Sequence, residues 1–221
     1  MPGRVSRFKM TGDGRCWQSE TTEGTRRAPS GRPEATFPEG YSIDYCCNLE
    51  DGDGYAMLLL TDALELVEDD GVPAVPRLGF ETGWVGRNSP ALVLAVASQT
   101  RCVVFHLRRM GDASPLMKLM FEEDTLFKAG TSFAAHHRAL FHCFPHFSSL
   151  HDLCFDAMAD DLSLLSSRVS LCDIFFRKFH AIIPLQRHLR VLDWTAPLSV
   201  EQQRLCALNA YCCFCLSRVL W

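Results

Sequence analysis

The 221-residue sequence has no long apolar run, no basic surplus and no glycine-rich phosphate loop. Its most apolar stretches, around 91–97 and 205–216, are interrupted by polar residues before they reach the roughly 18 residues that cross a bilayer. A membrane span is therefore excluded. Glycines recur between 71 and 86, but without the strand, turn and helix order of a nucleotide-binding fingerprint. No internal repeat occurs either.

Charge is acidic overall and unevenly distributed. The net charge is -4, of which residues 1–40 carry +2 and residues 41–221 carry -6. Proteins that bind nucleic acid usually have a basic surplus that replaces the counterions of the phosphates. We therefore expect any contact of this chain with RNA or DNA to depend on a local basic patch.

The eleven cysteines are an odd number, and most of them lie within apolar segments. Free cysteine in such a setting behaves as a small apolar side chain. Because no secretory signal sequence is present, we expect thiols, an intracellular reducing compartment and no disulfide scaffold.

Composition divides the chain into an extension and a domain. Residues 1–40 are rich in Gly, Pro, Ser, Thr and Arg and have no apolar periodicity, which predicts a disordered or partner-bound extension. Its arginines also resemble an organellar presequence, so a mitochondrial and a nuclear location both stay open. Residues 41–221 are expected to form one domain.

Periodicity in the second segment predicts an α/β domain. Apolar runs bounded by turn residues predict strands, and apolar positions three or four apart predict helices. The pair Ser114-Pro115 suits the start of a helix. Strands are expected at 42–49, 77–84, 91–98, 101–107 and 126–130, and helices over 58–67, after 115, and at 133–143, 149–158, 169–180 and 199–219. Strands with interleaved helices, followed by a helical half, indicate a mixed central sheet.

Several stretches occur in the order found in a known family. They are Leu78 to Trp84, Ala91 to Leu107, Lys128-Ala129-Gly130, Asp193-Trp194 with Pro197-Leu198-Ser199, and Asn209-Ala210-Tyr211. Together they resemble the 3′-to-5′ exonuclease domain of the DEDD superfamily, in the branch of the Werner syndrome exonuclease. The resemblance implies a ribonuclease-H-like fold, with a mixed sheet of about five strands flanked by helices and a helical C-terminal half.

The resemblance also implies a site, which this sequence has altered. The family uses four carboxylates around two divalent metals, and a tyrosine one helical turn before the last of them orients the attacking water. By position, the four carboxylates fall on Glu81, Gly83, His136 and Asn209, and the tyrosine on Leu205. Hard dications prefer anionic oxygens, so this set predicts poor Mg²⁺ binding.

We therefore expect a catalytically inactive, exonuclease-like domain without a cofactor. Its expected role is that of a structural or binding subunit with protein partners in a larger assembly, such as a ribonucleoprotein, and with secondary contact to RNA or DNA. The alternative is an active exonuclease with a divergent site. It would use Mg²⁺ or Mn²⁺ at Glu81, together with acids at Asp152, Asp156, Asp160 and Asp161.

Two further clusters have both a functional and an ordinary interpretation. The spacing of Cys143, His146, His151 and Cys154 would suit a tetrahedral zinc site in an interaction module, or the corner between two helices. The basic residues would suit a phosphate-binding track or a solvated surface. They are Arg138, Arg177, Lys178, Arg187 and Arg190.

Overall fold

The computed structural model describes residues 6–10, 17–21, 32–65, 75–83, 90–131, 139–146, 150–153, 170–184 and 193–220. Within these ranges no helix combines the length and the apolar character that a membrane span needs. The nine cysteines there are free thiols, as expected.

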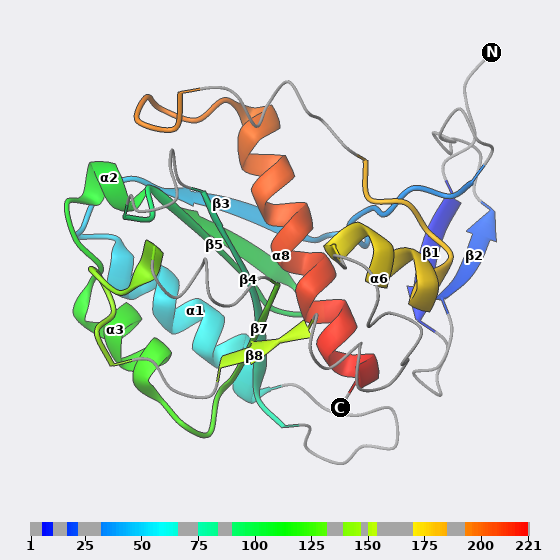
Figure 1. Cartoon of the computed structure of the whole chain (residues 1–221), viewed down its shortest axis with the longest axis horizontal. Helices are drawn as coiled ribbons and strands as arrows, with labels where there is room; N and C mark the ends of the chain where they lie inside the picture. Colours follow the sequence, from blue (N-terminus) through cyan, green and yellow to red (C-terminus); the bar gives the residue numbers. More distant parts are fainter. Residues whose placement is uncertain are drawn as a thin grey trace.

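The centre of the fold is a mixed sheet of six strands in the order β3, β6, β5, β4, β7, β8 (Figure 1). β5 runs antiparallel to β4 and β6, and the other neighbouring pairs are parallel. This confirms the predicted α/β class and the predicted meander through β4, β5 and β6. The strands are β3 (Ser42–Cys46), β4 (Arg77–Gly83), β5 (Val93–Ala97), β6 (Arg101–Phe105), β7 (Phe127–Gly130) and β8 (Leu150–Asp152).

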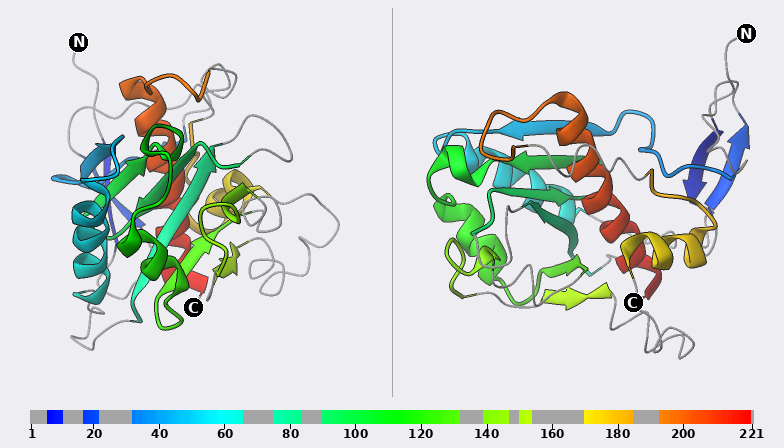
Figure 2. Two further views of the ribbon diagram at one scale, coloured as in Figure 1. Left: turned by 90° about the vertical axis from the view of Figure 1, so that its left-hand side faces the viewer. Right: turned by 45° about the horizontal axis from the view of Figure 1, so that its top comes forward.

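Helices cover both faces of the sheet (Figures 1 and 2). α1 (Gly52–Leu64) and α3 (Pro115–Glu122) pack together on one face, and the short α2 (Leu107–Met110) follows β6. α8 (Val200–Leu220) crosses the other face, with α6 (Leu171–Phe179) beside it. Each face has its own apolar cluster, and β5, buried along its whole length, contributes side chains to both.

Local capping signals explain where two helices begin. Ser114 accepts a hydrogen bond from the Met117 amide, and Pro115 occupies the first turn of α3. Ser170 and Asp173 form a reciprocal capping box at the start of α6. α6 ends at His180, which has a left-handed conformation with φ of 53°. The predicted starts of these two helices are confirmed.

Two predicted elements were wrong. α1 begins at Gly52, where a turn was expected, because the glycine lies buried against α3 instead of in a loop. Leu150–Asp152 was expected in a helix but forms β8, which pairs in parallel with β7. Short apolar segments do not distinguish strand from helix by their periodicity, and here the open edge of β7 decided the outcome.

Contacts with the domain begin before residue 41. The Ala35 amide donates to the Ile182 carbonyl over 2.8 Å, and the Ile182 amide donates to the Pro33 carbonyl over 2.9 Å. The Arg32 guanidinium lies 4.7 Å from the centre of the Phe176 ring. These contacts tie residues 32–35 to the end of α6. Farther upstream, β1 (Ser6–Met10) and β2 (Trp17–Thr21) form an antiparallel pair.

Candidate functional site

A pocket of about 240 Å³ lies where β4 ends beside the first half of α8. It is larger than the cavity beneath α6, which is only about 10 Å³. Three elements supply its walls: the end of β4, the segment before α8, and α8 itself. The lining residues are Glu81, Thr82, Gly83, Trp194, Leu205, Cys206 and Asn209.

The strand and the helix separate at this pocket. Side chains alternate along β4, so Gly79, Glu81 and Gly83 share the face toward α8. At Gly79 the helix lies so close that an added Cβ would be 2.1 Å from the Ala210 carbonyl oxygen. Farther along β4, at Glu81 and Gly83, the pocket separates the strand from the helix, and both residues line it.

On the α8 wall, Leu205 and Asn209 occupy the positions to which the resemblance assigned a tyrosine and a carboxylate. Leu205 and Asn209 are one turn apart on the same side of α8 and are each 7% exposed. Leu205 has no hydroxyl group with which to orient a water, and Asn209 offers a neutral amide where the family has a carboxylate. The α8 wall therefore contributes hydrogen-bonding capacity but no charge.

Trp194 closes the pocket over Gly83. A Cβ added to Gly83 would lie 3.4 Å from Cε3 and 3.6 Å from Cδ2 of the indole, which is ordinary van der Waals contact. The indole therefore borders the space into which a side chain at residue 83 would project. An alanine would fit here, whereas a glutamate would compete with the indole for room.

A buried histidine holds the Trp194 segment in place. His106 is fully buried, and its Nε2 lies 3.0 Å from the Trp194 carbonyl oxygen. A carbonyl only accepts, so Nε2 carries the proton, and Nδ1 accepts from the Tyr45 hydroxyl at 2.6 Å. The same hydroxyl accepts from the Leu198 amide at 3.4 Å. Burial lowers the pKa of His106, which favours this neutral form.

One buried donor near the pocket lacks a partner. Gln202 is 4% exposed, and its side-chain oxygen accepts from the Ser199 amide at 2.9 Å. Its Nε2 has no hydrogen-bond partner among the residues that the structure describes. Because Gln202 precedes Leu205 and Cys206 by about one turn, this unpaired donor lies on the same side of α8 as the pocket.

The donor set decides which metals the pocket fits. Glu81 is the single carboxylate among the described lining residues, and Asn209 adds one neutral oxygen. Two Mg²⁺ ions carry four positive charges, and one carboxylate cannot compensate them. These donors fit one largely hydrated cation, but they do not fit a pair of metals.

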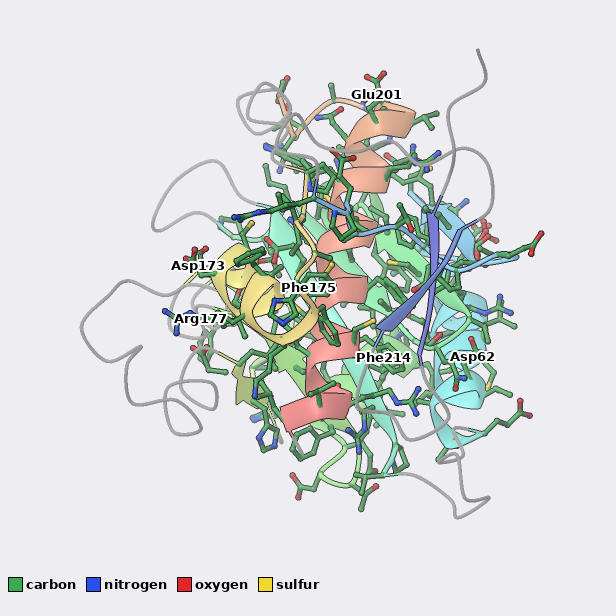
Figure 3. All side chains as sticks on the ribbon, turned by 90° about the vertical axis from the view of Figure 1, so that its right-hand side faces the viewer. Asp62, Asp173, Phe175, Arg177, Glu201 and Phe214 are labelled. Atoms are coloured by element: carbon green, nitrogen blue, oxygen red, sulfur yellow. The ribbon has the colours of Figure 1, made fainter. Side chains whose placement is uncertain are left out.

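Other predicted site residues lie elsewhere or outside the described ranges. Arg177 projects from α6 (Figure 3) and Lys178 is half-buried beside it, whereas α6 packs against α8 near Tyr211 and Cys212, beyond the pocket. Asp152 lies on β8 and does not line the pocket. The predicted residues outside the described ranges are His136, Arg138, Asp156, Asp160, Asp161, Arg187 and Arg190.

The structure does not bring the described members of the zinc set together. Within the described residues, no three His, Cys, Asp or Glu side chains form a group that could hold a metal ion. The His151 ring stacks on Phe127 with 3.5 Å between ring centres, and Cys143 packs against the apolar cluster of the α1 face. Cys154 lies outside the described ranges.

Residue types alone did not identify every residue that shapes the pocket. Trp194 was noted as part of a family motif, but not as a residue of the site. Tyr45 and His106 were missed, because they act through the backbone of a segment about 90 residues or more away in the sequence. A histidine directly after a strand was the available signal, but a buried histidine is more often structural.

Solved structures share this fold, although no family model and no curated protein sequence matches the chain. Escherichia coli RNase D, an exoribonuclease involved in structured RNA processing, is similar over 80% of this chain and 44% of its own length, with a TM-score of 0.65 and 11% identity. The catalytic core of Trypanosoma brucei RRP6 is similar over 100% of this chain and 60% of its own length, with a TM-score of 0.63 and 14% identity.

A third structure, Brucella melitensis NrnC with bound Mg²⁺, is similar over 81% of this chain and 78% of its own length, with a TM-score of 0.58 and 16% identity. The chain thus has the fold of a DEDD 3′-to-5′ exonuclease domain, as the sequence predicted. It spans less than half of RNase D and about three fifths of the RRP6 core.

The comparison corrects the expectation that the chain takes no cofactor. NrnC has this fold and holds Mg²⁺, so a divalent cation belongs to the chemistry that the fold supports. The expectation was wrong because it was inferred from missing charge alone, and a single carboxylate with an amide still offers oxygen ligands to one hydrated cation. Mg²⁺ is accordingly the cofactor with which the pocket has to be tested.

Proposed function

We propose that this chain is an exonuclease-like domain that no longer hydrolyses nucleic acid efficiently and serves as a binding subunit of a larger assembly. The observation that carries the proposal is the lining of the pocket between β4 and α8. Its described residues combine one carboxylate with an amide, a leucine and a glycine covered by an indole. Phosphodiester cleavage by this fold class needs much more negative charge around its metals.

The charge of the pocket supports slow hydrolysis even when a cation binds. A cation held by Glu81 and Asn209 keeps most of its water ligands, because Mg²⁺ dehydrates reluctantly. A lone hydrated ion does not clamp both the attacking and the leaving oxygen. Leu205 provides no hydroxyl to orient the attacking water, so two requirements of the reaction are missing together.

An acidic surface supports protein partners ahead of nucleic acid. Residues 41–221 carry a net charge of -6, which repels phosphates at long range. Arg177 and Lys178, in the last turn of α6, remain candidates for a local contact with RNA or DNA. Nucleic-acid binding is therefore proposed as secondary to assembly.

A hydrolysis assay tests the catalytic part of the proposal. The full chain is incubated with end-labelled single-stranded RNA and DNA in Mg²⁺ and, separately, in Mn²⁺. We expect no shortening above the buffer control in either metal. Stepwise shortening that is lost in Glu81→Gln but kept in Glu201→Gln, which changes an exposed residue at the start of α8, would establish the divergent-exonuclease alternative.

A metal titration tests the placement of the pocket ligands independently of activity. Asn209→Asp adds a carboxylate opposite Glu81, so we expect Mn²⁺ affinity to rise by about tenfold, as measured by calorimetry or electron paramagnetic resonance. The double variant Glu81→Gln/Asn209→Asp should lose that gain. Equal affinity in all variants would mean that Glu81 and Asn209 do not share a cation site.

The native mass of the particle tests the subunit role. A free chain has a mass of 24.9 kDa. In a native extract, we expect the protein to sediment in a much larger particle, and treatment with nuclease and high salt should show whether nucleic acid or protein holds it there. Sedimentation as a monomer under all conditions would contradict the role.

A further inference from the structure

The outward face of α1 is apolar. Met57, Leu58 and Leu64 are 54%, 41% and 69% exposed, and Met57 and Leu64 are two turns apart on one side of the helix. The opposite side is buried against the sheet through Ala56, Leu59 and Ala63. An ordinary surface helix has polar residues on its solvent side, so α1 departs from that pattern.

The two aspartates of α1 bind neighbouring segments of the protein, whereas Thr61 is exposed between Met57 and Leu64. Asp62 lies across the sheet from α6 (Figure 3). Its carboxylate accepts hydrogen bonds from the Ser98 and Thr100 hydroxyls. It also forms an ion pair with Arg101, whose Nε is 3.2 Å away. Asp53 accepts from the Leu116 amide at 2.8 Å and so ties α1 to the start of α3. The aspartates face the neighbouring turn and helix, while the apolar residues face solvent.

The helix beside α1 also exposes an apolar side chain. α1 and α3 pack against each other, and Leu119 of α3 is 61% exposed. Exposed apolar residues are common singly, but a group that spans two neighbouring helices marks a contact surface.

Acidic residues border this surface. Glu50 and Asp51 are exposed before α1 and Glu65 is exposed directly after it. The sequence contains eight acidic residues and no lysine or arginine between residues 50 and 76. Lys118 of α3 forms an ion pair with Asp112 at 2.6 Å. This pairing reduces the repulsion that the lysine would exert on a basic partner.

We infer that α1 is a docking surface for a basic amphipathic helix of a partner protein. Met57 and Leu64 match the spacing at which an amphipathic helix presents its apolar residues, and basic side chains on both flanks of that helix would meet the acids at the two ends of α1. The inference deepens the proposed subunit role. The subunit role and the docking surface can be contradicted independently. The mass of the native particle tests the role, whereas peptide binding tests the docking surface on α1.

Charge argues against the other occupants. A second copy docked through α1 would bring like acidic borders together, and an anionic lipid surface would be repelled by the same acids. The basic N-terminal extension of the same chain is poorly placed, because β1 and β2 lie beyond α6, at the opposite end of the molecule from α1 (Figures 1 and 2).

The test uses the full chain and two synthetic helical peptides of about 20 residues. Both carry leucines along one face, and their flanks carry either lysine and arginine or glutamate. By fluorescence anisotropy we expect saturable binding of the basic peptide, at least about tenfold weaker binding of the acidic one, and weakening of the basic complex between about 50 and about 300 mM salt.

Variants locate the binding site on the surface. Met57→Gln/Leu64→Gln should weaken the basic peptide by about tenfold or more. Val200→Gln, which changes a residue 70% exposed on α8, should have no effect. Glu50→Gln/Glu65→Gln should reduce the salt dependence while leaving both helices intact. Circular dichroism checks that each variant is folded.

Three results of the peptide titrations would overturn the inference. They are the absence of saturable binding up to about 1 mM peptide, equal binding of the acidic peptide, and equal binding by Met57→Gln/Leu64→Gln. A dimer seen by sedimentation that is lost in Met57→Gln/Leu64→Gln would assign the surface to a second copy instead, and would equally overturn it.

Discussion

Gly79 and Gly83 lie on the same face of β4, four residues apart, and their surroundings are opposite. A Cβ on Gly79 would lie 2.1 Å from the Ala210 oxygen and 2.3 Å from the Phe214 nitrogen, which are backbone atoms of α8. A Cβ on Gly83 would make ordinary van der Waals contact with two side chains, the Trp194 ring at 3.4 Å and the Val93 Cβ at 3.5 Å. The first glycine is required by the approach of the helix, whereas the second faces a pocket.

The difference shows that the fold and the pocket depend on different residues of one strand. Backbone packing at Gly79 leaves no room for any side chain, so the position of α8 on the sheet depends on it. Packing at Gly83 leaves room for one methyl group, although a longer side chain there would compete with the Trp194 indole. A chain can therefore keep this fold while the charge of its pocket changes.

The largest expected effect is at the close contact. Gly79→Ala places a methyl group inside the backbone of α8, so we expect the free energy of unfolding to fall by about 3 kcal/mol or more. Urea unfolding followed by circular dichroism measures it. A loss below about 1 kcal/mol would mean that α8 can shift away from β4 without cost.

The stability of the C-terminal half of α8, which is rich in buried thiols, can be tested at alkaline pH. Burial raises the pKa of Cys215 to about 12 and raises that of Cys212 as well. The unfolded thiol ionises near pH 9, so the stability from this burial is present below about pH 9 and is lost as pH rises toward 12. We expect a loss of about 2 kcal/mol between about pH 9 and pH 11.

Cys215→Ala isolates this effect. The variant should be less stable at neutral pH, because a buried side chain is truncated, but its stability should fall less steeply above pH 9. Lys128 has the opposite influence in both proteins. Burial lowers its pKa to about 8, so between about pH 8 and pH 10.5 its titration stabilises the fold as pH rises. Parallel pH curves for both proteins would exclude the thiol explanation.

At the pocket end we expect a smaller effect from Tyr45→Phe. It removes the hydroxyl that joins His106 to the Leu198 amide, which should cost about 1 kcal/mol and speed hydrogen exchange of the amides of Thr195, Ala196 and Leu198. Tyr55→Phe on α1 is the matched control. Unchanged exchange of these backbone amides would mean that the hydrogen bonds do not position Trp194.

The smallest expected effect is at the second glycine. Gly83→Ala adds one methyl group at van der Waals distance from Trp194, so the free energy of unfolding should change by no more than about 0.5 kcal/mol. Urea unfolding of Gly83→Ala and Gly79→Ala under the same conditions compares the two free energies of unfolding directly. A loss of about 2 kcal/mol or more would show that the pocket end of β4 is as tightly packed as the other end.

Much of the fold could be predicted because its signals are local. Apolar runs bounded by turn residues located β4, β5 and β6, and the Ser114-Pro115 pair located the start of α3. The resemblance associated Glu81 with Asn209, which are 128 positions apart in the sequence. The structure places both around one pocket, together with Gly83 and Leu205.

The rest depended on contacts that no local pattern contains. The helical pattern of α1 predicted Leu58 on the buried face and Asp62 on the solvent face, but Leu58 is exposed and Asp62 binds the turn between β5 and β6. The strand β8 exists because β7 had an open edge. The indole of Trp194 borders Gly83 from a segment that is hydrogen-bonded to Tyr45 on β3 and to His106 directly after β6.

Periodicity and turn residues were enough to define the class of fold and most of its elements, since each is a property of neighbouring residues, and the family resemblance indicated the residues of the candidate site. Packing between distant segments decided three other features. It decided which of the two glycines is indispensable, what covers the pocket and which side of α1 faces solvent. The physical reason is that the burial of a side chain and the distance between two elements depend on which elements pack together. The sequence of a single element does not specify its partner.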